Sequence, residues 1–118
     1  MNEKGLKMIR EGYSDCVEIS SLIKSKLNAD LVYENWRYIN DVRIINLCFE
    51  KYYFRNNSYA GLSLLITEAN FTQTIDVVGF GGGGGPFNLS WGANDDFLLS
   101  IVNLLIEKGF KNDYEFDI

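Results

Sequence analysis

Histidine is missing from all 118 residues of the chain. It is the commonest general base, the commonest metal ligand and the usual partner of a nucleophilic serine or cysteine. Its absence argues against an enzyme, although carboxylate or tyrosine chemistry stays open. The sequence therefore assigns no catalytic residue, and we expect neither a metal site nor a cofactor.

Clustered positive charge is also missing. The chain has 11 Lys and Arg residues against 16 Asp and Glu, a net charge of -5, and its basic residues are scattered. Nucleic-acid phosphates and anionic lipids both favour clustered Lys and Arg, so neither is expected as a partner. No window approaches the length of about 18 apolar residues that spans a bilayer, and the N-terminus lacks the apolar core of a signal peptide. We therefore expect a cytoplasmic protein.

Cysteine is scarce, with only Cys16 and Cys48 in the chain. They lie in separate predicted elements, one helical and one extended, and neither belongs to a C-x-x-C pattern. Zinc motifs and dithiol redox motifs are therefore missing. We expect two small buried thiols.

Apolar residues, in contrast, make up 47% of the chain and aromatic residues 14%. Such a composition is typical of a well-packed globular protein, and the length fits one domain. We expect a single α+β domain over residues 1–110. Residues 111–118 are predicted to form an acidic C-terminal tail, with a short edge strand as the alternative.

The first helical pattern covers residues 14–28. Apolar side chains recur there at steps of three and four, and Ser14 or Asp15 can cap the start. Asn28 can close the helix in a left-handed turn. This segment is predicted to be an amphipathic helix of about four turns.

A second helical pattern covers residues 94–108. Asn94 is the expected cap, and Asp95 and Asp96 follow in the first turn, where negative charge is favoured. Gly109 stands where glycine most often ends a helix.

Alternating apolar and polar residues predict five strands. An edge strand is expected over residues 4–13, with Leu6, Met8 and Arg10 on one side. The other four strands are joined by short turns and therefore form an antiparallel meander, in which Phe71 shares a face with the apolar residues of the last strand. These strands cover residues 29–39, 42–55, 59–69 and 71–80, with turns at 40–41, 56–58 and 68–70.

The predicted order of elements is β-α-β-β-β-β-α. One antiparallel sheet with both helices on one face would bury both amphipathic stripes in a two-layer α+β sandwich. The other face of that sheet would then carry polar and aromatic residues.

A run of five glycines, Gly81 to Gly85, has three interpretations. A phosphate-binding loop is disfavoured because no Lys follows the run and no helix is predicted to start inside it. A flexible tether is disfavoured because apolar, strand-like residues flank the run on both sides. We favour a strand end with positive-φ backbone, whose free amides could form a nest for a small anion. The candidate ligand-binding residues are Gly81, Gly82, Gly83, Gly84, Trp91 and Tyr52.

Three marks of the sequence point to a known family: the E-K-Y-Y stretch at Glu50 to Tyr53, the glycine run, and the Trp91-Gly92 pair before the last predicted helix. Over residues 6–106 the chain resembles a family of small bacterial proteins known only as a domain of unknown function. The resemblance implies no assigned activity. The strand order is also similar to that of TATA-binding-protein-like folds, which is a likeness of shape and implies no role.

Three functions are compatible with these residues. The first is a non-enzymatic binding module that forms a homo-oligomer or binds a protein partner, because the chain has more aromatic residues than one small core needs. The second is a small-molecule carrier with the glycine run at the lip of its pocket. The third is an enzyme that uses carboxylates, but spacing alone places no two of them together. We favour the first. The aromatic residues in excess are Trp36, Tyr38, Tyr52, Tyr53, Phe54, Tyr59 and Trp91, and the candidate carboxylates are Glu50, Asp76, Asp95 and Asp96.

Overall fold

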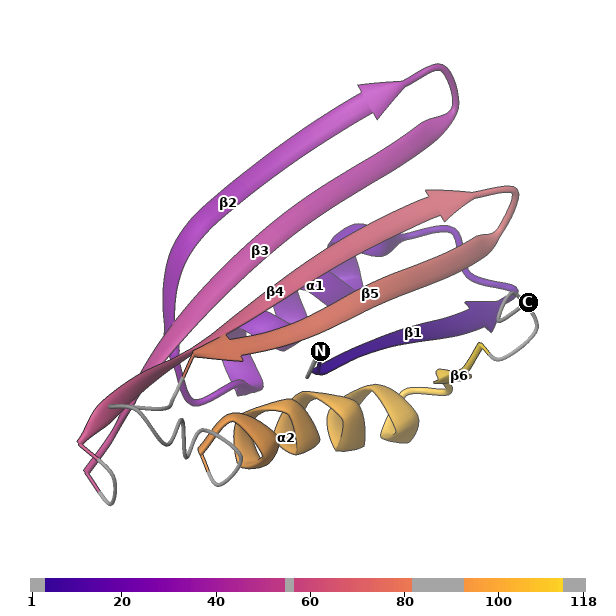
Figure 1. Ribbon diagram of the computed structural model, residues 1–118. Helices are drawn as coiled ribbons and strands as arrows, with labels where there is room; N and C mark the ends of the chain where they lie inside the picture. Colours follow the sequence, from indigo (N-terminus) through magenta and orange to yellow (C-terminus); the bar gives the residue numbers. More distant parts are fainter. Residues whose placement is uncertain (1–3, 55–56, 82–92, 114–118) are drawn as a thin grey trace.

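The computed structural model describes residues 4–54, 57–81 and 93–113 of the chain (Figure 1). Within these ranges it contains two helices and six strands, so the α+β class is confirmed. The strands are β1 (Lys4–Glu11), β2 (Asp30–Ile39), β3 (Val42–Tyr53), β4 (Ser58–Ala69), β5 (Thr72–Gly81) and β6 (Lys111–Asn112), and the helices are α1 (Cys16–Lys26) and α2 (Ala93–Glu107).

All six strands belong to one antiparallel sheet with the order β2-β3-β4-β5-β1-β6. The predicted meander from β2 to β5 is confirmed. The prediction that the first strand is an edge strand is wrong, because β1 pairs along its whole length with β5 on one side and through Met8 and Ile9 with β6 on the other. The first two residues of the expected tail thus form a short strand. The likeness to TATA-binding-protein-like folds and the placement of both helices on one face stay predictions.

Two-residue turns connect β2 to β3 and β4 to β5. Asn40 adopts φ 53° in the first turn, while Asn70 and Phe71 adopt φ 53° and φ 59° in the second. Two successive positive φ angles make a type I′ turn, whose twist matches that of the flanking strands. The prediction that Phe71 lies in a strand is therefore wrong: Phe71 is a turn residue, and its side chain is 66% exposed.

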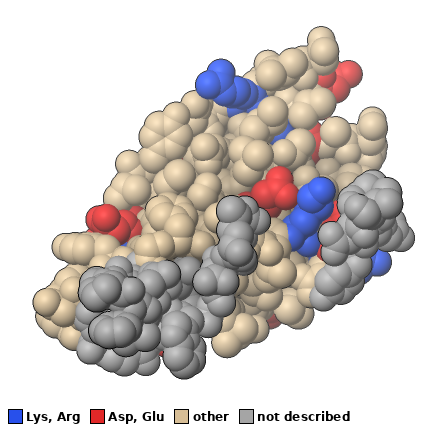
Figure 2. Space-filling model, in the orientation of Figure 1, with Lys and Arg blue, Asp and Glu red and all other residues tan. Residues whose placement is uncertain are grey.

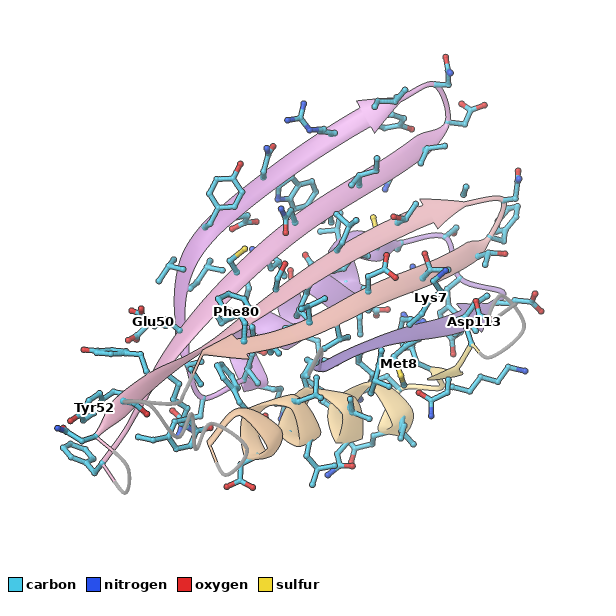
Figure 3. All side chains as sticks on the ribbon, in the orientation of Figure 1. Lys7, Met8, Glu50, Tyr52, Phe80 and Asp113 are labelled. Carbon is cyan, nitrogen blue, oxygen red and sulfur yellow. The ribbon has the colours of Figure 1, made fainter. Side chains whose placement is uncertain are left out.

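The hydrophobic core forms on one side of the sheet. Alternate residues of β3, β4 and β5 are buried there, as the period-two pattern predicts. Met8 of β1 is fully buried among them (Figure 3). Buried side chains from both helices join the same cluster. The helical members are Cys16, Ile19, Ile23, Phe97, Ile101, Val102 and Leu105.

Helix α1 begins where the sequence predicts and ends earlier. Asp15 is the N-cap, and its carboxylate accepts a hydrogen bond from the Val17 N–H. The C-cap is Leu27, in extended conformation with φ -77° and ψ 124°. The predicted left-handed turn at Asn28 is wrong, because extended backbone at Leu27 leads the chain directly toward β2.

Helix α2 ends as predicted. Gly109 adopts φ 97°, its N–H donates to the Ile106 carbonyl, and the Phe110 N–H donates to the Leu105 carbonyl at 2.9 Å. These two bonds form a Schellman motif, which satisfies the last carbonyl groups of a helix. At its other end α2 begins at Ala93, so Asn94 lies inside the first turn and not at the cap. Neither described helix combines the length and the apolar character that crossing a membrane requires.

Candidate functional site

Two of the six predicted ligand-binding residues, Tyr52 and Gly81, are described, and they lie at the same end of the sheet. Tyr52 of β3 pairs with Tyr59 of β4, and the next residue of β4, Ala60, pairs with Gly81 at the end of β5. Gly81 adopts φ 73°, as expected for a glycine at a strand end. Gly82, Gly83, Gly84 and Trp91 lie outside the described residues.

Aromatic rings gather around Tyr52. Its ring lies 5.0 Å from that of Phe54 in an edge-on arrangement and 4.9 Å from that of Tyr59. The Tyr52 hydroxyl also donates a hydrogen bond to the side-chain oxygen of Asn57. Tyr52, Phe54 and Tyr59 form what we call the Tyr52 cluster, and the Phe54 side chain is 88% exposed. The cluster therefore presents aromatic surface to solvent.

Phe80 extends this aromatic surface across β4. It pairs with Gly61, and its ring lies over that residue (Figure 3). A Cβ atom added to Gly61 would lie 2.3 Å from the Phe80 ring. A glycine at position 61 is thus what lets the ring pack flat on the neighbouring strand.

The sheet face opposite the core, here called the open face, carries few charged side chains. In the orientation of Figure 2, tan surface separates small groups of red and blue. Hydrogen bonds join the Asn35 amide to the Tyr33 hydroxyl at 2.9 Å and the Cys48 thiol to the Asn46 side-chain oxygen at 3.9 Å. Strand register defines three neighbouring rows of this face as Arg37–Ile44–Thr67–Thr74, Asn35–Asn46–Leu65–Asp76 and Tyr33–Cys48–Ser63–Val78.

Strand β2 is exposed along nearly its whole length. Nine of its ten residues are exposed, whereas its neighbour β3 has buried residues at alternate positions. The helices pack mainly on β4, β5 and β1, so most of the side chains on the core side of β2 are left uncovered. Trp36 is 47% exposed and Tyr38 is 66% exposed on that side. The other large apolar residues exposed on β2 are Leu31, Val32, Tyr33 and Ile39.

One ion pair connects β2 to α1. Lys24 Nζ lies 3.0 Å from Glu34 Oε2, and the same oxygen accepts a 2.6 Å hydrogen bond from the Trp36 indole N–H. The indole hydrogen bond and Lys24 together lower the pKa of Glu34. These contacts hold the indole of Trp36 beside Glu34.

A row of polar side chains crosses the core side of the sheet, and three of its four members, Glu68, Gln73 and Arg10, are buried. Arg43 pairs with Glu68, Glu68 with Gln73, and Gln73 with Arg10. Arg10 Nε donates to Gln73 Oε1 at 2.8 Å. Glu68 Oε1 accepts a 2.6 Å hydrogen bond from the Cys16 backbone N–H, at the first turn of α1. A carboxylate is favoured there because a helix N-terminus carries free N–H groups and partial positive charge.

Arg10 binds the end of α2 as Glu68 binds the start of α1. Its Nη1 donates a 2.7 Å hydrogen bond to the Lys108 carbonyl, and its guanidinium lies 3.6 Å from the Tyr13 ring centroid and 4.6 Å from that of Phe110. Arg10 is only 6% exposed. Burial lowers the pKa of Arg10, while Tyr13 and Glu18 oppose that effect.

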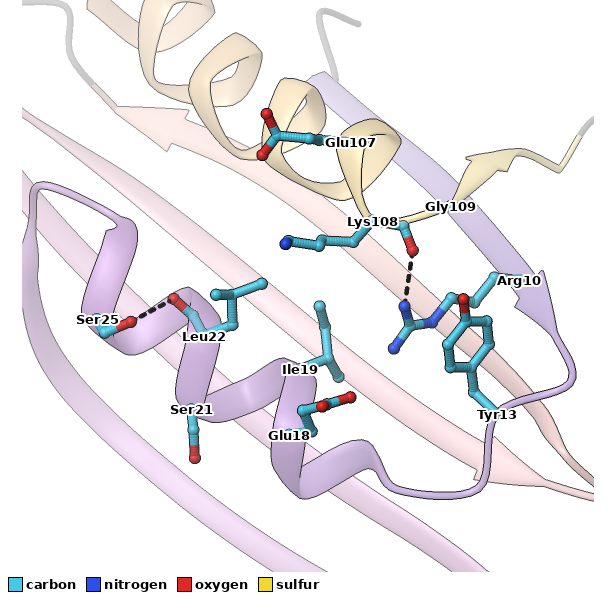
Figure 4. Close-up of a pocket in the computed structure, with 10 residues that line it drawn as sticks. All are labelled: Arg10, Tyr13, Glu18, Ile19, Ser21, Leu22, Ser25, Glu107, Lys108 and Gly109. Atoms are coloured by element: carbon cyan, nitrogen blue, oxygen red, sulfur yellow. Dashed lines mark hydrogen bonds between the residues drawn. The ribbon is translucent and has the colours of Figure 1, made fainter.

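A pocket of about 740 Å³ opens beside this guanidinium, between α1 and the end of α2 (Figure 4). Residues of α1 from Glu18 to Ser25 form one wall, and residues 107–109 form the other. Its volume is within the range of about 300–1,000 Å³ that is typical of small-molecule sites. No pattern in the sequence predicts this pocket.

The two cysteines occupy different environments. Cys16 is fully buried, whereas Cys48 is partly exposed on the open face, so the prediction of two buried thiols is correct only for Cys16. Burial, together with the nearby Glu68 side chain, raises the pKa of Cys16 to about 11. The buried thiol therefore stays protonated at neutral pH.

Among the described side chains, Glu50, Asp76 and Asp96 lie on different elements or in different cross-strand rows. Glu50 lies in the cross-strand row of Gly61 and Phe80, and Asp76 lies in the row of Leu65. Asp96 is on α2, and the side chain of Asp95 lies outside the described ones. No group of three or more His, Cys, Asp or Glu side chains that could hold a metal ion occurs in the described ranges.

Sequence reasoning missed the roles of Glu68 and Arg10. The predictions place Glu68 where the strand over 59–69 and the turn over 68–70 overlap, and the structure places it in β4, in phase with the buried Leu62, Leu64 and Ile66. Arg10 was predicted on the apolar side of its strand, and no partner was assigned to it. A charged residue in the phase of an apolar stripe is the signal that indicates a buried polar partner.

The architecture defines the class of this protein, an α+β fold built on one antiparallel sheet. The chain belongs to a family of unknown function, DUF6054, whose sequence model matches residues 13–108. The predicted membership in an uncharacterised domain family is thus confirmed, while the bacterial origin and the glycine-rich motif of that family stay predictions. Searches of curated proteins and of solved structures found no match.

Proposed function

We propose that this protein is a non-enzymatic interaction module of the cytoplasm, in which β2 pairs edge to edge with β2 of a second copy. The observation that carries the proposal is the exposure of β2 on both faces, with six large apolar side chains along it. In the sheet order of the described strands, its outer edge has no neighbour. An edge of this kind is a template for pairing with another chain.

The backbone of β2 has hydrogen-bonding groups available for such pairing. Ile39 and Val42 close the two-residue turn to β3, so they form a hydrogen-bonded pair. Hydrogen-bonded and non-hydrogen-bonded pairs alternate along an antiparallel ladder. By this alternation the backbone groups of Glu34, Trp36 and Tyr38 point away from β3. Pairing with a second copy would satisfy them.

Charge favours a second copy in antiparallel orientation. On the open face, Asp30 and Glu50 pair at the start of β2, and Arg37 pairs with Ile44 near its end. A two-fold axis perpendicular to the sheet brings the start of one β2 beside the end of the other. Arg37 of each copy then approaches the acidic end of its partner, and like charges are kept apart.

The paired edge would also cover the uncovered aromatic residues. The proposal takes both helices to lie on one face of the sheet. Trp36 and Tyr38 of the two copies would then contact each other on that face, next to the helices, and extend the core. Aromatic side chains of this kind contribute most of the binding energy at many interfaces. The open face, the Tyr52 cluster and the glycine run then offer surface for a further protein or a ligand.

The test is the oligomeric state measured by analytical ultracentrifugation over a range of protein concentrations. We expect the wild-type chain to dimerise. Trp36→Pro removes an outward N–H and the indole, and Trp36→Ala removes the indole alone. Because proline is tolerated where the N–H of an edge strand faces solvent, both variants should fold, with Trp36→Pro fully monomeric and Trp36→Ala a weaker dimer.

Leu99→Glu is the control, because Leu99 is an apolar residue on α2 that is at least as exposed as Trp36. This variant should dimerise like the wild type. A wild-type chain that stays monomeric at high concentration, or a Trp36→Pro chain that dimerises normally, would contradict the proposal.

A further inference from the structure

We propose that the pocket between α1 and the end of α2 binds a small zwitterion with an apolar side chain, such as an amino acid. Its carboxylate would lie against Arg10, its ammonium toward Glu18, and its apolar part on Ile19 and Leu22. This site is distinct from β2 and from the glycine-lipped pocket that the sequence suggested.

Arg10 is prepared to bind a carboxylate. Hydrogen bonds from Nε to Gln73 and from Nη1 to Lys108 fix the plane of the guanidinium, and the Tyr13 and Phe110 rings hold it from the sides. Both acceptors are neutral carbonyl oxygens, so neither neutralises its charge. Figure 4 shows the second terminal nitrogen of Arg10 pointing into the pocket. A preorganised guanidinium that keeps N–H donors for a ligand is suited to a planar carboxylate.

The other residues that line the pocket indicate which groups the ligand carries besides its carboxylate. Arg10 and Lys108 bring two positive charges to the pocket and Glu18 and Glu107 bring two negative charges, so a dipolar molecule is better matched than a simple anion. Glu18 lies beside Arg10 in Figure 4 and interacts with it electrostatically. Between these charges and Ser25, α1 presents the side chains of Ile19 and Leu22, which suit an aliphatic group.

The experiment measures binding of three probes by isothermal titration calorimetry. Leucine carries both charges, 4-methylpentanoate lacks the amine, and 3-methylbutylamine lacks the carboxylate. We expect leucine to bind most tightly and the amine most weakly. Absence of heat from leucine at concentrations up to about 10 mM would overturn the proposal. Binding of 4-methylpentanoate as tight as that of leucine would overturn the ammonium contact.

Two variants locate the contacts. Glu18→Gln should lower the affinity for leucine at least about tenfold, the factor that corresponds to loss of one charged contact. The affinity for 4-methylpentanoate should stay unchanged or rise. Arg10→Lys, checked for folding by circular dichroism, should abolish binding of both carboxylates. Glu11→Gln is the control, because it removes the same charge outside this pocket. Equal weakening of both carboxylate probes by Glu18→Gln would contradict the assignment.

Binding of these probes does not depend on the pairing of β2 with a second copy. Binding can be measured in the monomeric Trp36→Pro chain as well as in the wild type. Failure of the ligand site and failure of the proposed dimer are therefore separately visible.

Discussion

Arg10 Nη1 donates a 2.7 Å hydrogen bond to the backbone carbonyl of Lys108, a residue 98 positions further along the chain. The bond joins the first strand to the residue that directly follows the last helix. On the same row, Glu68 holds the start of α1 through the Cys16 N–H. Polar residues of the sheet thus fix one end of each helix, with a charge of the sign that each helix dipole favours.

Loss of the Arg10 side chain should destabilise the protein strongly. Arg10→Ala leaves Gln73 Oε1 and the Lys108 carbonyl without their charged donor, and it removes the guanidinium from the Tyr13 and Phe110 rings. Hydrogen bonds to charged groups contribute about 1.5–3 kcal/mol each, so we expect a loss of about 3 kcal/mol in the free energy of unfolding. Urea denaturation measures it.

Lys26→Ala is the control for Arg10→Ala, since Lys26 is an exposed cation whose loss should change stability by no more than about 0.5 kcal/mol. A loss below about 1 kcal/mol for Arg10→Ala would show that this buried network is not a stabilising feature.

The β4–β5 turn should gain stability from Phe71→Gly. Phe71 has φ 59° and is mostly exposed, so little packing is lost on substitution. A left-handed backbone costs a non-glycine residue about 1–2 kcal/mol, while the extra freedom of glycine in the unfolded chain takes back about 0.5–1 kcal/mol. We expect a net gain of about 0.5 kcal/mol in urea denaturation.

Phe71→Ala separates backbone strain from loss of the ring. Alanine keeps the Cβ atom and therefore keeps the strain, so its stability should equal that of the wild type. An equal gain in both variants would show that the exposed ring, and not the positive φ, is the source of the effect.

Gly61 and Phe80 should be energetically coupled. Gly61→Ala places a methyl group where the Phe80 ring lies, so the ring must move, and we expect a cost of about 1 kcal/mol. In a Phe80→Ala background the same substitution should be neutral or stabilising, because alanine suits a strand better than glycine by about 0.5–1 kcal/mol. A double-mutant cycle in urea measures the coupling, and additive effects would contradict the packing described here.

Cys16 should make stability fall at alkaline pH. Its pKa in the folded protein is raised to about 11 from an ordinary value of 9.0. The unfolded chain therefore loses this proton first, and the contribution of the thiol is full below pH 9 and is lost as the pH rises toward 11. Denaturation curves across this range measure the effect, and Cys16→Ala is the control that should flatten it. Equal slopes in both proteins would count against the buried thiol.

The sequence predicted most of the sheet because its alternation is regular. Leu62, Leu64 and Ile66 of β4, and Ile75 and Val77 of β5, are buried as the period of two requires. Turn residues were harder to predict. The position of Phe71 was assigned from its apolar character, whereas the register of the two flanking strands places it in the turn.

The candidate site was less predictable, since it depends on contacts between distant segments. Spacing could show that Arg10 lies in the phase of Leu6 and Met8, but not that Gln73 and Lys108 would meet it. The exposure of β2 could not be predicted from the sequence either. Trp36 and Tyr38 occur in a pattern that a buried strand would also show. They stay uncovered because the helices pack mainly against other strands, which the sequence pattern does not indicate.

The pairing of β1 has a consequence for synthesis of the chain. The first strand leaves the ribosome early, yet its partners Gln73 and Lys108 lie 63 and 98 residues behind Arg10. Protein synthesis adds about 5–20 residues per second, so Leu6 and Met8 stay uncovered for several seconds. The hairpins from β2 to β5 can form before the last helix is made. We therefore expect the newly synthesised chain to expose these two apolar side chains until its last helix has emerged.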